Sequence, residues 1–254
     1  MNTVIGLLII AIGAFCQSSS YVPINKIKKW SWESYWLIQG VFAWLIFPIL
    51  GALLAVPQGH GLFELYAAAP KESFLTMFFG VLWGVGGLTF GLSMRYLGVA
   101  LGQSIALGTC AGLGTIMGPV LLNIFFPELD ALSSLTAAVI IGVVTTLAGI
   151  AIIGIAGGMK SASLSEEEKK EAVKDFNFPK GLAIALLAGF MSGCFNVGLE
   201  FGKELNFGEL TDPMFRTLPA TLLVTVGGFL TNACYCIFQN VRNRTFTDYK
   251  DGKL

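Results

Sequence analysis

Seven apolar stretches long enough to cross a membrane follow one another along this chain of 254 residues. An α-helix rises about 1.5 Å per residue, so about 20 residues cross the roughly 30 Å of bilayer hydrocarbon. Repetition of such stretches predicts an all-α membrane protein, a polytopic bundle of about seven transmembrane helices. The predicted spans are residues 4–22, 35–56, 74–94, 99–126, 132–157, 181–201 and 218–238.

Charged residues are scarce and unevenly distributed. They make up 13% of the chain, against about 25% in a typical soluble domain. The links after the first, third, fifth and seventh spans hold all but three of the 16 Lys and Arg residues, and the exceptions are Lys71, Lys203 and Arg216. Because positive residues stay cytoplasmic, we expect the N-terminus outside and the tail after the seventh span inside. The net charge of zero gives no reason to expect nucleic acid as a partner.

The second part of the chain echoes the first. Shifted by 175 positions, Gly-Leu-Leu-Ile at 6–9 falls on Gly-Leu-Ala-Ile at 181–184. Five helices precede a polar linker, so a second copy would enter the membrane from the opposite side, as in the inverted repeats of transporters. We predict a first five-helix repeat at 1–158, a cytoplasmic linker at 159–180, and the first two helices of a second repeat plus a tail at 181–254.

Polar and aromatic side chains inside the spans are the candidate binding residues. Amides both donate and accept hydrogen bonds, as a sugar requires. Polar groups are costly in lipid, so their presence inside a span indicates a function. An indole face can cover the C–H face of a sugar ring. The alternative is that the amides join neighbouring helices and the tryptophans only pack. The candidates are Trp44, Trp83, Gln17, Gln39, Gln103 and Asn196.

Two carboxylates are candidates for carrying a proton. Glu200 lies near the outer end of the sixth span, one turn after Asn196, where it could be partly desolvated. An ordinary helical ion pair with Lys203, three residues later, is the alternative. Glu33 lies at the cytoplasmic edge of the second span, in a Trp- and Lys-rich cluster that also suits an interfacial anchor.

Other chemistry is not indicated. The five cysteines lie in predicted spans without metal-ligand spacing, and the single histidine lies in an outer loop. Without a nucleophile and base at a membrane face, we expect no enzyme activity, no catalytic residues, no cofactor and no metal. A seven-helix sensor or receptor shares the expected orientation and stays open as an alternative.

Several motifs resemble the bacterial L-rhamnose–proton symporters of the drug/metabolite transporter superfamily. The order and spacing match, and the resemblance extends over the whole chain. The residues that carry it are Lys28-Lys29-Trp30-Ser31-Trp32-Glu33, Gly40 and Trp44, Trp83-Gly84-x-Gly86, the run from Phe90 to Gly98, and Phe176-Asn177.

The resemblance implies a multi-pass carrier in the cell inner membrane that imports L-rhamnose, a deoxyhexose, with a proton. It also implies ten helices in two inverted repeats of five, whereas this chain stops at Leu254. We therefore expect a C-terminally truncated chain that is incomplete as a carrier and that is unstable alone or oligomerises. A carrier of another sugar or metabolite in the same superfamily is the nearest alternative.

Overall fold

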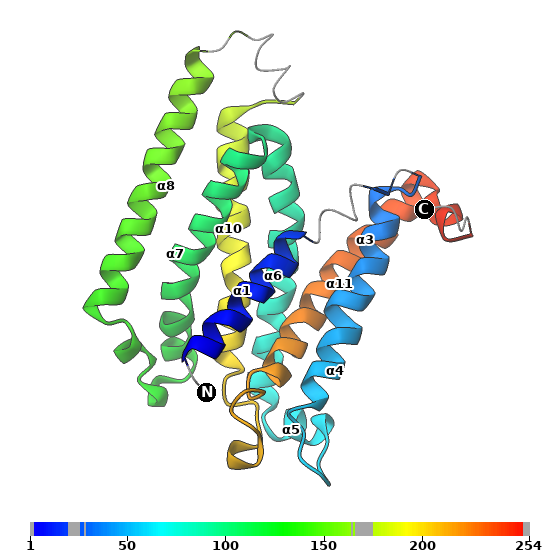
Figure 1. Ribbon diagram of the computed structural model, residues 1–254, viewed down its shortest axis with the longest axis vertical. Coiled ribbons are helices and arrows are strands. Elements are labelled where there is room, and N and C mark those ends of the chain that lie inside the picture. Colours follow the sequence, from blue (N-terminus) through cyan, green and yellow to red (C-terminus); the bar gives the residue numbers. More distant parts are fainter. Residues whose placement is uncertain (1–2, 20–25, 28, 164, 166–174, 251–254) are drawn as a thin grey trace. The chain divides into compact units, whose positions relative to one another are not determined.

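The computed structural model describes residues 3–19, 26–27, 29–163, 165 and 175–250, and their regular structure is entirely helical (Figure 1). The long helices follow the predicted order. They are α1 (Thr3–Ser19), α3 (Trp32–Gly40) continued by a π-helical stretch η1 (Val41–Ile46) and α4 (Phe47–Leu53), α6 (Pro70–Leu97), α7 (Val99–Phe125), α8 (Ala137–Ser163), α10 (Phe178–Phe201) and α11 (Leu218–Asn243). Short helices are α5 (Leu62–Ala68), η2 (Pro127–Leu129), η3 (Ala131–Ser134), η4 (Gly208–Leu210) and η5 (Thr245–Lys250).

Among the described residues, six helices are long and apolar enough to cross a membrane. The first apolar helix is shorter, with its apolar part at Val4–Cys16, and the end of its predicted span, residues 20–22, lies outside the described residues. Each of the other six predicted spans corresponds to one long helix. The prediction of a polytopic helix bundle is therefore confirmed, and the chain is a multi-pass membrane protein.

The fifth span begins five residues later than predicted, at Ala137. Asp130 adopts a left-handed conformation with φ 42°, and Ser133 and Ser134 bond back to the carbonyls of Asp130 and Ala131. These local bonds compete with a regular helix. Thr136 then accepts a hydrogen bond from the backbone N–H of Val139 at 3.4 Å, which places a cap at the helix start.

The second span is locally widened around Trp44. Pro48 has no backbone N–H, and in a regular helix its ring would clash with the carbonyl of Trp44, four residues earlier. The chain forms the π-helical stretch Val41–Ile46 just before it. Such stretches are rare and occur often at functional sites.

The chain divides into two compact units, Met1–Gly40 with Ala233–Leu254, and Val41–Asn232. In the larger unit α10 packs along both α6 and α7, and α8 packs on α7 (Figure 1). One apolar cluster joins α6, α7 and α10, with Phe79 stacked on Phe201 at 5.3 Å between ring centroids. A second cluster, around Leu97, Ile105 and Ala185, lies toward the other end of the same helices.

Glycines set the closest approaches. A Cβ on Gly80 of α6 would meet the backbone carbonyl of Val224 on α11, and one on Gly227 of α11 would lie 2.7 Å from the backbone nitrogen of Val81. The two helices are therefore in backbone contact, as small residues permit in lipid. Gly87 and Gly91, which continue the stripe of Gly80 along α6, have nothing within 4 Å of a Cβ position.

Four glycines of α7 form two pairs that face different neighbours, Gly108 with Gly112 and Gly114 with Gly118. A Cβ on Gly108 would lie 2.7 Å from Ile150 of α8, and one on Gly114 would lie 2.8 Å from the Asn196 amide of α10. Small residues on two sides of one helix let α7 lie between α8 and α10 at short distances to both.

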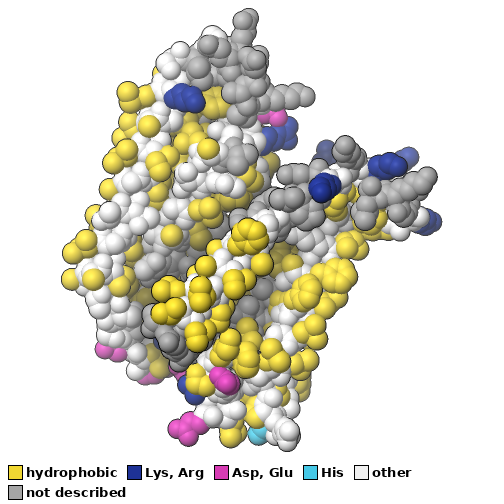
Figure 2. All heavy atoms as spheres, in the orientation of Figure 1, with side chains coloured by type: hydrophobic (Ala, Val, Ile, Leu, Met, Phe, Trp, Pro, Cys, Tyr) yellow, Lys and Arg dark blue, Asp and Glu magenta, His cyan; other side chains and the backbone are white. Residues whose placement is uncertain are grey.

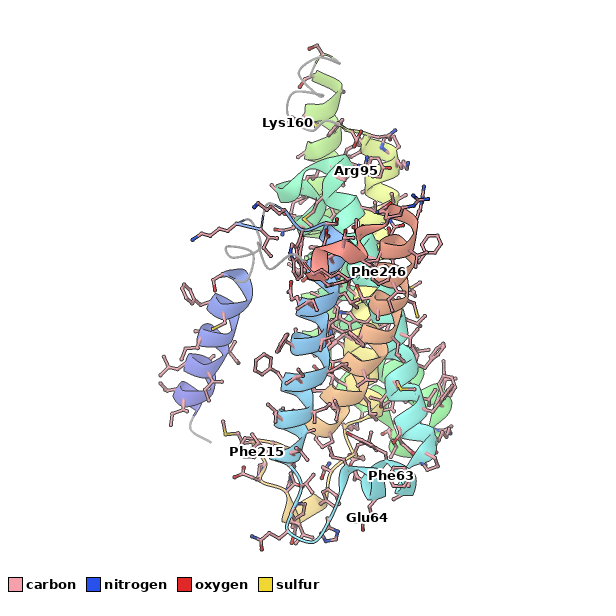
Figure 3. The ribbon with its side chains drawn as sticks, turned by 90° about the vertical axis from the view of Figure 1, so that its right-hand side faces the viewer. Phe63, Glu64, Arg95, Lys160, Phe215 and Phe246 are labelled. Atoms are coloured by element: carbon pink, nitrogen blue, oxygen red, sulfur yellow. The ribbon has the colours of Figure 1, made fainter. Side chains whose placement is uncertain are left out.

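Charged side chains gather toward the helix ends, and apolar side chains cover the lengths between them (Figure 2). In the larger unit, Arg95 and Lys160 lie toward one end and Glu64 lies toward the other (Figure 3). At the first end Arg95 pairs with Asp175 at 2.7 Å. This distribution suits helices whose middle parts contact lipid and whose ends reach water.

Candidate functional site

Two of the predicted site residues, Trp44 and Trp83, lie together in the larger unit. Their ring centroids are 6.0 Å apart and the rings are nearly perpendicular, with an interplanar angle of 78°. Phe195 of α10 extends the cluster, with its ring centroid 4.9 Å from that of Trp83. Three different helical segments therefore contribute to one aromatic group, which we call the aromatic cluster (Trp44, Trp83 and Phe195).

Local structure fixes the position of each indole. Trp44 lies in the π-helical stretch before Pro48, and Trp83 lies on α6 opposite Gly228 of α11. A Cβ on Gly228 would come within 2.5 Å of the Trp83 ring, so the absence of a side chain there makes room for the indole. Both tryptophans are only partly buried, and part of each ring is thus available for contact.

A buried amide that the sequence analysis missed lies next to Trp83. Asn232 of α11 is buried, and its Nδ2 donates to the carbonyls of Gly228 at 2.9 Å and Gly84 at 3.4 Å. Thr231 beside it donates to the carbonyl of Val81 at 2.8 Å. An amide in the middle of an apolar span is the signal that could have identified Asn232.

The other predicted amides are distributed over the chain. Gln39 ends α3 in the smaller unit, and its buried Oε1 has no hydrogen-bond partner among the described residues. Gln103 is half-buried in the first turns of α7. Asn196 is exposed on α10, next to Phe195 of the aromatic cluster and against Gly114 of α7. The side chain of Gln17 lies outside the described part of the structure.

Glu200 lies one turn after Asn196 on the side of α10 that faces Gly118 of α7. Its Oε1 accepts a hydrogen bond from Lys203 Nζ at 2.8 Å, and its side chain is 34% exposed. The helical ion pair considered in the sequence analysis is therefore present. The pair borders a small cavity of about 150 Å³, whose other charged lining residues are Glu72, Glu128 and Glu204.

Glu33, the second predicted proton carrier, is buried in the smaller unit with only 6% of its surface exposed. Its Oε1 accepts hydrogen bonds from Asn243 Nδ2 at 2.8 Å and Thr245 Oγ1 at 3.0 Å. Both donors are neutral. The carboxylate is therefore held by hydrogen bonds in a setting where the charged form has lost most of its water.

The segment after α11 closes over the start of α3 through a polar network. Asn240 is fully buried; its Oδ1 accepts from Ser34 Oγ at 3.0 Å, and its Nδ2 donates to the carbonyl of Cys236 at 2.9 Å. Its Nδ2 also lies 3.3 Å from the hydroxyl of Tyr249. The bond between Ser34 and Asn240 joins two segments 206 positions apart in the sequence.

Asp248 of η5 adds a charged contact to the same network. Its Oδ2 accepts a hydrogen bond from the backbone N–H of Ser31 at 2.9 Å, just before α3 begins. This bond holds the pKa of the Asp248 carboxyl below its ordinary value. Because the folded-state pKa is depressed, the contact stabilises at neutral pH, and its contribution is lost as the pH falls through that pKa.

The chain matches one transporter family along nearly its whole length. A profile of the L-rhamnose-proton symport protein (RhaT) family matches residues 1–250 of the chain. The chain belongs to this family. An L-rhamnose-proton symporter of Cronobacter sakazakii is 33% identical over 253 residues, which are 98% of this chain and 70% of that relative.

Two further L-rhamnose-proton symporters are similar to the chain. The L-rhamnose-proton symporter of Escherichia coli is 31% identical over 236 residues, 90% of this chain and 64% of that protein. That of Yersinia pestis bv. Antiqua is 30% identical over 244 residues, 93% of this chain and 67% of that protein. The chain thus spans about two thirds of the length of these relatives. It is a membrane transporter-family protein and not an enzyme. No solved structure matches it.

Proposed function

We propose that this chain binds L-rhamnose and takes part in moving it, with a proton, across the bacterial inner membrane. Family membership and the aromatic cluster support this proposal. At about 30% identity, family membership supports the transport of a sugar together with a proton. Which sugar is bound depends on the residues of the binding site. L-rhamnose presents an apolar methyl group and C–H faces as well as hydroxyls, which suits a site that combines indole rings with amides.

In this proposal Trp44 and Trp83 together contact the sugar ring from one side, because the two indoles touch each other edge to face and leave no space for a sugar between them. Their perpendicular rings offer one face and one edge, so a sugar could stack on one indole and touch the other with its methyl group. Gln17, Gln39, Gln103 and Asn196 are the proposed hydrogen-bond partners of the hydroxyls. Gln39 is supported by its unsatisfied Oε1, since a buried acceptor without a partner costs about 1–3 kcal/mol and gains most from a ligand that donates to it.

For the proton, we propose a carboxylate, either Glu33 or Glu200. Deep burial favours Glu33, because protonation there removes a charge that has lost most of its water. The hydrogen bonds from Asn243 and Thr245 act in the opposite direction, since both donors stabilise the charged carboxylate. Glu200 already has a positive partner in Lys203. Its position beside the acidic cavity gives it a route to the aqueous end of the helices.

Equilibrium binding with competing sugars tests the substrate. We expect labelled L-rhamnose to bind the purified chain and to be displaced by unlabelled L-rhamnose at lower concentrations than by L-fucose, L-mannose or D-glucose. L-Mannose differs from L-rhamnose only by a hydroxyl on the methyl carbon, so it reports whether the site selects the apolar methyl group. Stronger displacement by another of these sugars would move the assignment to a different substrate in the same superfamily.

We also propose that the two parts of the chain, 1–158 and 181–254, belong to two inverted repeats joined by the linker at 159–180. In such carriers one repeat rocks against the other around a site at their interface. The proposal requires the chain to start outside the cytoplasm and to cross the membrane seven times, with α1 as the first and shortest crossing.

Cysteine labelling tests this orientation. In a cysteine-free background, Gln58→Cys in the loop after α4 should react with a membrane-impermeant maleimide in intact cells, because we place that loop outside. Ala162→Cys at the end of α8 should react only after the cells are made permeable. Both positions are exposed, so access to solvent does not differ between them. The reverse pattern of labelling would contradict the orientation and the repeat proposal with it.

A further inference from the structure

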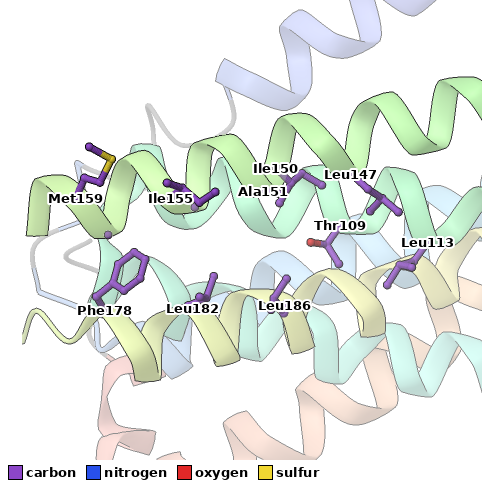
Figure 4. A pocket seen from close by; sticks show the side chains of 12 residues that line it. Thr109, Leu113, Leu147, Ile150, Ala151, Ile155, Met159, Phe178, Leu182 and Leu186 are labelled. Carbon is purple, nitrogen blue, oxygen red and sulfur yellow. The ribbon is translucent and has the colours of Figure 1, made fainter.

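An apolar groove opens between α8 and α10, with α7 behind it (Figure 4). It has a volume of about 560 Å³. At one end lie Met159 and Phe178, and at the other lie Leu113 and Leu147. Among its twelve lining residues Thr109 is the only polar one. The groove lies within the larger unit, away from the aromatic cluster, and the sugar site makes no use of it.

The groove has the length of a single lipid tail. Its lining on α8 runs from Leu147 to Met159, which corresponds to about 18 Å at 1.5 Å per residue. One leaflet accounts for roughly half of the 30 Å hydrocarbon core, about 15 Å. The groove also begins at the charged end of α8, since Lys160 follows Met159 directly. It therefore runs from the depth of the lipid headgroups to about the middle of the membrane.

The width of the groove suits a hydrocarbon chain. About 560 Å³ spread over ~18 Å gives a mean cross-section of about 30 Å². A helix with its side chains has a cross-section of about 80 Å², so a helix from another copy of the chain could place only its side chains in the groove. A hydrocarbon chain is thin enough to lie within the groove along its length.

A lysine lies at the end of the groove where a headgroup would lie. Lys160 on α8 is exposed and follows the lining residue Met159 directly. Lys180 on α10 does not face the groove, because its Nζ donates to the hydroxyl of Tyr96 on α6 at 2.9 Å and lies 4.4 Å from the centroid of that ring. The nearby Asp175 is engaged by Arg95 at 2.7 Å.

We propose that this groove is a phospholipid site that holds one acyl chain of an anionic lipid, with the lipid phosphate at Lys160. The apolar walls select a hydrocarbon chain, and the lysine selects a negative headgroup. The retained lipid fills the space between α8 and α10. It therefore connects α10 to α8, which otherwise packs mainly on α7.

Glycines on α8 give a matched pair of variants for the test. Gly154 lines the groove, whereas Gly142 lies on the same helix outside it. A Cβ at either position meets nothing within 4 Å, so neither substitution introduces a clash at its Cβ. Gly154→Leu fills the middle of the groove, and Gly142→Leu changes only the exposed surface of the helix.

Native mass spectrometry of the purified chain, with phosphatidylglycerol and phosphatidylcholine of equal chain length, measures the site directly. We expect the unmodified chain and Gly142→Leu to retain one phosphatidylglycerol, and Gly154→Leu to lose that retention at least tenfold. Lys160→Gln should reduce the preference for phosphatidylglycerol over phosphatidylcholine about fivefold, the effect of one basic residue near an anionic headgroup. Equal retention by Gly154→Leu, an unchanged preference in Lys160→Gln, or a lipid-free dimer in place of the lipid-bound chain would overturn the proposal.

Discussion

Gly80→Val is expected to reduce the free energy of unfolding by about 3 kcal/mol, at the upper end of the usual cost of overpacking. A Cβ on Gly80 would collide with the carbonyl oxygen of Val224 and lie 2.8 Å from its Cα. Both are backbone atoms, so no side-chain rotation relieves the contact. The valine can be accommodated only if α6 and α11 move apart, which removes the close packing on which helix association in lipid depends.

Gly87→Val provides the control for this prediction. It places the same residue on the same helix, with the same change in helix propensity, at a position where a Cβ meets nothing within 4 Å. Thermal unfolding of the two variants in one detergent, followed by size-exclusion fluorescence, compares them directly. We expect Gly87→Val to melt close to the unmodified chain and Gly80→Val to melt well below it. Equal melting temperatures would mean that α6 and α11 are not in backbone contact.

Trp83→Ala is expected to weaken L-rhamnose binding by about 1–3 kcal/mol, which corresponds to a five- to 150-fold higher Kd. Trp83 lies at the centre of the aromatic cluster, between Trp44 and Phe195. Its removal takes away the proposed stacking surface and leaves Trp44 without its neighbour. Trp83→Phe keeps an aromatic face in the same place and should retain much of the affinity.

Trp36→Ala separates a loss of binding from a general loss of structure. Trp36 stacks on Trp32 with ring centroids 5.4 Å apart. The Trp36→Ala substitution therefore also removes an indole from an aromatic pair, but at a place outside the proposed site. Isothermal titration with L-rhamnose, on variants first checked for a monodisperse elution profile, gives the comparison. Similar affinities for Trp83→Ala and the unmodified chain would leave Trp83 as a packing residue.

The order and number of helices could be predicted from the sequence because span length and charge asymmetry are set by the bilayer itself. Helix ends were less predictable, since they depend on local hydrogen bonds. The fifth span was predicted to begin at Leu132 because the apolar composition begins there. The helix begins only at Ala137, because Asp130 is left-handed and the side chains of Ser133 and Ser134 bond back to preceding carbonyls.

Glycine spacing identifies the faces of close packing only in part. The four-residue spacing of Gly80 and Gly84 identifies the face of α6 that meets α11, but Gly87 and Gly91 on the same stripe have no neighbour within 4 Å. A spacing gives the face of a helix, but not how far along that face a neighbour stays in contact. That depends on the crossing of the two helices, which the sequence of one helix does not contain.

The proposed site was also predictable only in part. Trp44 and Trp83 were both among the predicted binding residues, and the structure brings their ring centroids to 6.0 Å. Asn232 and Asn240 were missed, although both are polar residues in an apolar helix. Their partners, Gly84 and Ser34, are about 150 and 200 positions away in the sequence, so only the folded chain reveals what these amides bind.

The central claim is that the chain binds L-rhamnose together with a proton, and proton uptake on sugar binding tests it most directly. Linkage requires that if a proton raises the affinity for the sugar, the sugar raises the affinity for the proton equally. Addition of L-rhamnose to the purified chain in a weakly buffered solution should therefore make the solution more alkaline, by at most about one proton per bound sugar for a single coupled carboxylate. Glu33→Gln or Glu200→Gln should abolish this uptake, whichever carboxylate carries the proton. L-rhamnose binding without proton uptake, or no binding of L-rhamnose at all, would contradict the account.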